Sequence, residues 1–129
     1  MIRQATSADL EVLCKLCLEK IKENNWKELS GATVDEDSVN AVVKYHIVHR
    51  DGFAYVNETG GVIDGVFLGC VMPWTLDLNY KAAHEKMGFG GNLDALWETF
   101  LQWAIEKNAI TCVRSCFEVL EGQRFRRLR

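Results

Sequence analysis

Long apolar runs, excess positive charge and a targeting segment are all missing from this sequence. No apolar stretch reaches the roughly 20 residues that a membrane span needs, and residues 1–4 lead directly into folded-looking sequence without a signal peptide. The formal net charge is −3, which gives no electrostatic footprint for nucleic acid. We therefore expect a cytoplasmic protein with no membrane or nucleic-acid partner.

A disulfide framework and a zinc motif are missing as well. Five cysteines are an odd number for paired disulfides, and free thiols in a reducing cytoplasm explain them most simply. Cys14 and Cys17 form a C-x-x-C pair, but no second such pair and no His pair follows at zinc-ligand spacing. Both lie on the apolar stripe of a predicted helix, where Cys packs as a small apolar residue. We predict no metal site.

The composition is that of one folded domain. The chain is 48% hydrophobic and 26% charged, which is typical of a soluble globular protein and not of a disordered chain. It has 129 residues, enough for a core without covalent staples. Because no internal repeat or linker interrupts the pattern, residues 1–129 are expected to form a single domain.

The first half of the chain predicts a strand followed by two helices. Residues 2–5 are expected to form the strand, and Thr6 is expected to cap the first helix with Asp9 as its capping-box partner. That helix carries an apolar stripe at helical spacing, formed by Leu10, Leu13, Cys14, Cys17 and Ile21. A second helix is expected over 35–50, with an inner face of Val39, Val42, Val43 and Ile47 and a partly buried structural histidine, His46, beside it.

The second half predicts strands that flank one strong helix. Segments 53–57 and 62–72 form a hairpin that Pro73 ends, and a third strand covers 75–80. A glycine-rich turn then leads into a helix over 93–107, a strand over 110–119 and the start of a helix within 123–129. The predicted order is β-α-α-β-β-β-α-β-(α), an α/β fold of α+β layers.

The glycine-rich segment is the best candidate for a binding site. Gly88, Gly90 and Gly91 lie between a predicted strand and a predicted helix. The first amides of a helix have no intrahelical partner, and glycines let the backbone approach a phosphate closely. Such a cluster is a plain turn at least as often as a phosphate site, so the pattern leaves both interpretations open.

The order of elements, together with two local motifs, resembles the GNAT superfamily of N-acetyltransferases. The motifs are the opening Ile2-Arg3-Gln4-Ala5-Thr6 with Asp9-Leu10, and Gln102-Trp103-Ala104 near the end of the strong helix. The resemblance covers essentially the whole chain and indicates a short member that lacks the family's C-terminal elements, of a kind that also occurs in phage genomes. It implies a mixed central sheet with helices on both faces.

The resemblance also implies a cofactor and a reaction. In the family, the turn Q/R-x-x-G-x-G/A binds the pyrophosphate of acetyl-CoA, and the matching stretch here is residues 85–90. The residues implied to bind acetyl-CoA are Leu78, Tyr80, Lys86, Met87, Gly88, Phe89, Gly90, Gly91 and Asn92. The implied reaction is direct attack by an amine of a small molecule or protein on the thioester. Candidate acid–base residues are Asp77, His84 and Cys116.

Two other hypotheses remain open. Glu85 places a carboxylate where the family has Gln or Arg, and all three tyrosines precede residue 117, so the tyrosine that usually protonates the leaving thiolate is missing from its place. These features favour an inactive GNAT-like binding or assembly module. An open sheet edge would then favour a homodimer. An unrelated α+β domain with an incidental glycine turn is the third hypothesis.

Overall fold

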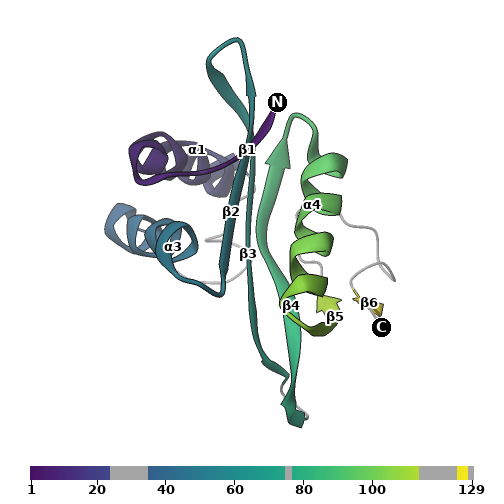
Figure 1. Ribbon diagram of the computed structural model, residues 1–129. Helices are drawn as coiled ribbons and strands as arrows, with labels where there is room; N and C mark the ends of the chain where they lie inside the picture. Colours follow the sequence, from purple (N-terminus) through teal and green to yellow (C-terminus); the bar gives the residue numbers. More distant parts are fainter. Residues whose placement is uncertain (24–34, 75–76, 114–124, 128–129) are drawn as a thin grey trace.

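A single mixed sheet forms the centre of the protein (Figure 1). The computed structural model describes residues 1–23, 35–74, 77–113 and 125–127. Within them the sheet has six strands in the order β1-β2-β3-β4-β5-β6. Helices α1 and α3 cover one face and α4 covers the other, as Figure 1 shows. The predicted α/β fold with helices on both faces is confirmed.

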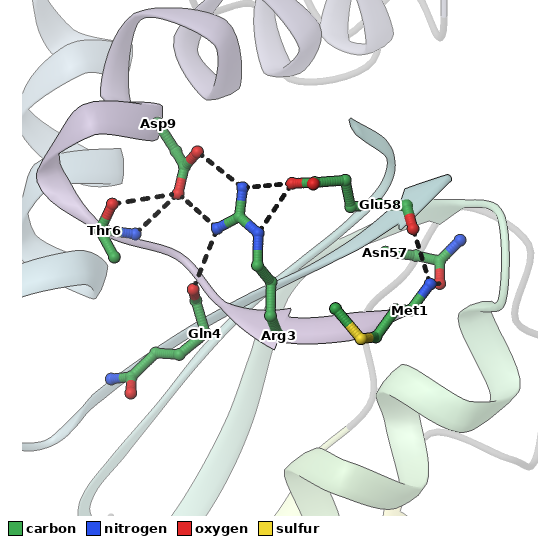
Figure 2. A network of polar contacts seen from close by, with 7 residues as sticks. All are labelled: Met1, Arg3, Gln4, Thr6, Asp9, Asn57 and Glu58. Atoms are coloured by element: carbon green, nitrogen blue, oxygen red, sulfur yellow. Dashed lines mark hydrogen bonds and ion pairs between the residues drawn. The ribbon is translucent and has the colours of Figure 1, made fainter. Parts of the chain in front are cut away.

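The chain enters the sheet through an edge strand that polar contacts hold in place. Strand β1 (Ile2–Gln4) pairs antiparallel with β2, and a short 3-10 helix, η1 (Ser7–Asp9), leads into α1 (Leu10–Glu23). The Asp9 carboxylate accepts the Thr6 amide hydrogen at 2.8 Å, as the capping pattern predicts. Arg3 lies between the carboxylates of Asp9 and Glu58 and so ties this corner to β2 (Figure 2).

The apolar stripes of α1 and α3 (Glu36–Val48) form the core on one side of the sheet. The predicted stripe of α1 is confirmed, since Leu13, Cys14 and Cys17 are buried there. In α3 the prediction was wrong at one position: Val42 is 50% exposed, whereas His46 is 4% exposed. Residues 39, 43 and 46 lie on one helical face, and position 42 falls outside it.

Strands β2 (Gly52–Thr59) and β3 (Val62–Trp74) form the predicted hairpin, and β3 also pairs with β4 (Asp77–Gly90). The prediction that Pro73 ends the strand was wrong, because Pro73 lies inside β3 opposite Lys81. In the described part of the sheet, β2 begins opposite Cys70, which leaves Pro73 with a strand partner on one side only, and the register shifts next to Pro73. An open edge and a bulge are the places where a sheet accepts proline.

Helix α4 (Leu93–Glu106) forms an aromatic core on the opposite face. Phe53, Phe67 and Phe100 pack ring to ring, with centroids 4.9–5.8 Å apart. The predicted inner face of this helix is confirmed, since Leu96, Trp97, Phe100, Leu101 and Ala104 are all buried.

The last described strands are β5 (Ala109–Val113), parallel to β4, and β6 (Phe125–Arg127), antiparallel to β5. The prediction of a final helix within 123–129 was wrong for residues 125–127. A strand of three residues obtains its backbone hydrogen bonds from its neighbour, so no local pattern could indicate it. Residues 114–119 of the predicted strand, with Cys116, lie outside the described residues.

Candidate functional site

Most of the glycine-rich segment is a strand and not a turn. Strand β4 continues through Gly90, with Gly88 paired to Phe67 and Gly90 paired to Gly65 on β3. The prediction that β4 ends near residue 80 was therefore wrong. Glycines favour turns locally, but the 13 residues of β3 offer β4 a pairing partner along its whole length, and this tertiary pairing prevails.

The true turn, Gly90–Asn92, packs against the start of β3. Gly90 has a φ of +90°, and a Cβ there would lie 2.2 Å from the Asp64 carbonyl oxygen. The Gly91 amide donates to that same carbonyl at 2.8 Å. A Cβ on Gly65 would lie 2.1 Å from the Gly91 oxygen. These glycines are therefore required by backbone packing within the protein, whatever a ligand would add.

The amino end of α4 remains open next to this turn. Asn92 precedes the helix in the left-handed region, with a φ of 61°, and its side chain makes no capping hydrogen bond. It donates instead to the Asn57 Oδ1 atom at 3.3 Å. In the described part of the chain, no acceptor meets the amides of Leu93, Asp94 and Ala95. Together with the helix dipole, these amides favour an anion.

The described pairing of β4 with β5 covers only the middle of β4. The parallel pairing runs from Lys81, opposite Ala109, to His84, opposite Val113. From Glu85 to Gly90, β4 pairs only with β3 among the residues described. Among the described residues this edge of β4 carries no further strand, and it leads from His84 to the amino end of α4; both features together form the candidate site.

A cluster of titratable side chains lies beside the start of this open edge. His84 is half-buried and Cys70, its partner on β3, is buried. Burial, and then the charge of Lys86, lower the pKa of His84 below its ordinary value. Burial raises the pKa of the Cys70 thiol. His84 is therefore neutral at neutral pH and able to accept a proton, whereas Cys70 remains a thiol.

Glu85 lies on the other face of the sheet. It is 1% exposed, and its Oε1 lies 3.2 Å from where a Cβ on Gly88 would be, next to Leu93 and Phe67. Since these neighbours belong to the α4 side of the sheet, the carboxylate is directed away from the cluster of His84. The residue that departs from the family motif thus does not place its charge beside that cluster.

The structure separates the remaining predicted site residues. Leu78 and Tyr80 are exposed near the start of β4, while Gly88–Asn92 lie at its other end. Ten residues of strand separate Tyr80 from Gly90, or about 33 Å at roughly 3.3 Å per residue. Asp77 begins β4 at the same far end, and its side chain is outside the description. Lys86, Met87 and Phe89 lie on the open part of β4.

Sequence reasoning overlooked one residue of this region, Asn57, and the place of another, His46. Asn57, 5% exposed on β2, donates to the Asp64 carboxylate at 2.7 Å and accepts from Asn92, so it helps to fix the turn before α4. His46, predicted as a partly buried structural histidine, packs on β2 from α3, where a Cβ on Gly52 would lie 2.9 Å from its Cα atom, and burial lowers the pKa of its ring. Only the folded register brings Asn57 next to Asn92, and no local pattern marked this contact.

Among the described residues, the thiols of α1 indicate no metal site and no helix indicates a membrane span. Cys14 and Cys17 belong to the apolar core, and burial raises the pKa of Cys17 to about 12. In the described ranges no three His, Cys, Asp or Glu side chains gather as a metal site. None of the helices there combines the length and apolar character that crossing a bilayer requires.

The fold is that of known acetyltransferases. No family model and no curated protein sequence matches this chain. Solved structures do match: an acetyltransferase of Vibrio fischeri at 17% identity and a TM-score of 0.69, over 91% of this chain and 96% of that one. A predicted acetyltransferase of Clostridium acetobutylicum, solved with acetyl-CoA, matches at 10% identity and a TM-score of 0.71, over 89% of this chain and 79% of that one.

A third match has a more specific name. It is a ribosomal-protein-alanine N-acetyltransferase of Brucella melitensis, at 14% identity and a TM-score of 0.66, over 94% of this chain and 82% of that one. At such identities the likeness establishes the architecture. The chain thus has the GNAT-like acetyltransferase fold, in agreement with the resemblance seen in its sequence.

Proposed function

We propose that this protein is an acetyl-CoA-dependent N-acetyltransferase that acts on an amine of a small molecule or protein. The observation that carries the proposal is the uncapped amino end of α4, which follows β4 and its turn within a GNAT-like fold. One protein of similar structure was solved with acetyl-CoA. Another is named for acetylating a protein alanine, and a third is an aminoglycoside acetyltransferase in complex with sisomicin.

The residues present fit acetyl-CoA at the amino end of α4, and Met87, Gly88, Phe89, Gly90 and Gly91 remain predicted contacts of the cofactor. The amides of Leu93, Asp94 and Ala95 are open and would bind the pyrophosphate, as anions bind at other helix N-termini. The glycines of the turn are already packed against β3. Lys86, on the bulge of β4, adds a positive charge on the path between His84 and α4.

When bound, acetyl-CoA supplies an acetyl thioester whose C–S bond breaks as the amine nitrogen bonds to its carbonyl carbon. The backbone of β4 between His84 and Gly90 would orient this group. His84, neutral at neutral pH, would take the first proton from the ammonium of the acceptor. The second proton would leave with the sulfur of the cofactor. Asp77 and Cys116 remain predicted acid–base residues, and Leu78 and Tyr80 remain predicted contacts of the cofactor.

Calorimetric titration with acetyl-CoA and CoA tests the proposal. Two variants change the charge at the amino end of α4 in opposite directions. Asn92→Asp adds a carboxylate at the amino end of α4 and is expected to weaken binding roughly fivefold, or about 1 kcal/mol. Asp94→Asn removes one and is expected to tighten binding by a similar factor. Aspartate tolerates the left-handed backbone of position 92, and thermal melting verifies that both variants remain folded.

The two possible results separate the enzyme from the binding module. Micromolar affinity that changes in opposite directions in the two variants supports the proposed acetyltransferase. An absence of binding at millimolar acetyl-CoA contradicts it and favours the GNAT-like module without activity.

A further inference from the structure

Asn57 is a buried polar residue in an otherwise apolar row of β2. Phe53 and Tyr55 precede it on the same face of the strand and belong to the aromatic core under α4. Asn57 is 5% exposed, and β3 approaches it so closely that a Cβ on Gly65 would lie 3.2 Å from the Asn57 Cβ atom. Because a buried amide is unfavourable unless its polar atoms are hydrogen-bonded, the contacts of this side chain indicate its role.

The hydrogen bonds of Asn57 fix the orientation of its amide group. Its Nδ2 atom donates to the Asp64 carboxylate at 2.7 Å, and an ionised carboxylate can only accept. The Oδ1 atom is therefore the acceptor on the other side, and it accepts from the Asn92 Nδ2 atom at 3.3 Å and from the Met1 amino group at 3.3 Å. Asn57 thus connects the start of β3 to the residue that precedes α4.

Asn92 occupies the N-cap position of α4 but does not cap the helix. Asparagine at this position normally has an extended backbone, and its side-chain oxygen accepts from the second or third amide of the helix. The N-cap of α3 follows this rule, since Asp35 has a φ of −105° and accepts from the Ser38 amide at 2.7 Å. Asn92 instead has a φ of 61° and a ψ of 31°, and its side chain makes no capping bond. The helix end is open although a residue suited to close it is in place.

The hydrogen bond to Asn57 accounts for this conformation of Asn92. The left-handed region is less favourable than the extended region for any residue except glycine, although asparagine tolerates it. Asn92 is an exposed residue, so packing around its side chain does not explain the backbone. Within the part of the chain that the structure describes, the side chain that bonds to Asn92 is that of Asn57. This bond draws the Asn92 side chain toward β2 and away from the amides of α4.

We propose that Asn57 is a positioning residue that keeps the amino end of α4 uncapped, so that the amides of Asp94 and Ala95 remain available to the pyrophosphate of acetyl-CoA. This inference rests on the proposed function, because it names the residue that prepares the cofactor site. Without Asn57, Asn92 is free to adopt the extended conformation, and its Oδ1 atom then accepts from the Asp94 or Ala95 amide. The helix gains a cap, and the anion loses a donor.

Amide hydrogen exchange measured by NMR tests the inference without any cofactor. Asn57→Ala is expected to slow the exchange of the Asp94 or Ala95 amide about fivefold, the factor that corresponds to a capping bond of about 1 kcal/mol. Adding Asn92→Gly to this variant should return the exchange to its original rate, since glycine adopts the left-handed conformation readily and has no side chain that could cap. A purely structural loss at position 57 would not be corrected by removing a second side chain.

Inorganic pyrophosphate is the probe for the anion. Its binding, followed by the amide chemical shifts of residues 93–95, should weaken about fivefold in Asn57→Ala and recover in the double variant with Asn92→Gly. Thr59→Val is the matched control. It removes a second donor to the Asp64 carboxylate but leaves the bond between Asn57 and Asn92 in place, so neither the exchange rates nor the affinity should change.

Exchange that stays unchanged in Asn57→Ala, pyrophosphate binding that does not recover in the double variant, or an equal effect of Thr59→Val overturns the inference. If Asn57→Ala does not fold, Asn57→Val also lacks a hydrogen-bonding side-chain atom, suits a strand and decides the question by the same signals. Acetyl-CoA binding by the unmodified protein is measured separately. Its failure refutes the proposed function, while the exchange rates still decide whether Asn57 keeps the end of α4 open.

Discussion

At the level of single residues, Gly69 illustrates how closely α4 approaches the sheet. A Cβ at this position would lie 2.4 Å from the Phe100 Cε1 atom and 2.8 Å from Cζ, and the Phe100 side chain is fully buried. The aromatic ring cannot move away, because Phe53 and Phe67 pack against it. The absence of a side chain at position 69 is therefore a condition for the packing of the helix.

We predict that Gly69→Ala lowers the free energy of unfolding by about 1–3 kcal/mol through overpacking. On the Gly69→Ala background, Phe100→Leu should cost less than it does alone, because the smaller side chain makes room for the added methyl group. Urea denaturation of the two single variants and the double variant measures this coupling. Strictly additive costs would show that the ring and the methyl group do not compete for the same space.

At the level of elements, Asp9 joins η1 to β1 through Arg3, and Arg3 in turn pairs with Glu58 on β2. Its carboxylate accepts from the Arg3 guanidinium at 2.8 and 3.0 Å and from the Thr6 amide at 2.8 Å (Figure 2). The hydrogen bonds from Arg3 are the main cause that lowers the pKa of Asp9 to about 2, with burial opposing them. The lowered pKa means that the ionised carboxylate is favoured by folding.

The stability from Asp9 is thus fully present above its unfolded pKa, about 3.9, and is lost as the pH falls toward about 2. We predict that Asp9→Asn lowers the free energy of unfolding by about 1–2 kcal/mol at pH 7, since it removes the negative charge that strengthens the hydrogen bonds from Arg3. The variant should also lose less stability than the unmodified protein between pH 4 and pH 2. Chemical denaturation across this range measures both effects. Glu19→Gln, an exposed carboxylate of α1, should show neither.

At the level of the whole molecule, the β3–β4 hairpin extends beyond its neighbours in the sheet (Figure 1). Strand β2 begins opposite Cys70 and β5 begins opposite Lys81, so the outer part of the hairpin has open edges among the described strands. This part also carries apolar side chains in solvent: Leu78 is 78% exposed and Tyr80 is 48% exposed. Open edges and exposed apolar residues together favour self-association.

We predict a homodimer formed through this hairpin, with twice the mass of one chain in light scattering. Leu78→Glu places a charge in the contact and should shift the protein to the mass of one chain. Val62→Glu is the control, because Val62 is 65% exposed at the opposite end of β3. A single-chain mass for the unmodified protein would refute the prediction, and an equal effect of both variants would refute this location.

The local pattern of the sequence sufficed for much of the fold. Apolar spacing identified the inner faces of α1 and α4, and the hairpin of β2 and β3 followed from strand runs separated by turn residues. These predictions succeeded because a helix or a hairpin is specified by residues near one another in the chain. The α/β fold followed from the order of the elements for the same reason.

The candidate site depended on contacts between distant segments. Local propensity treats Gly88 and Gly90 as turn residues, but pairing with β3 made them strand. His46 came to lie against β2 only because α3 packs on Gly52. The bulge at Lys86 comes from a register between β3 and β4 that neither strand specifies alone. Strand register and helix docking depend on contacts between residues far apart in the chain, so only the tertiary structure could decide where these residues lie.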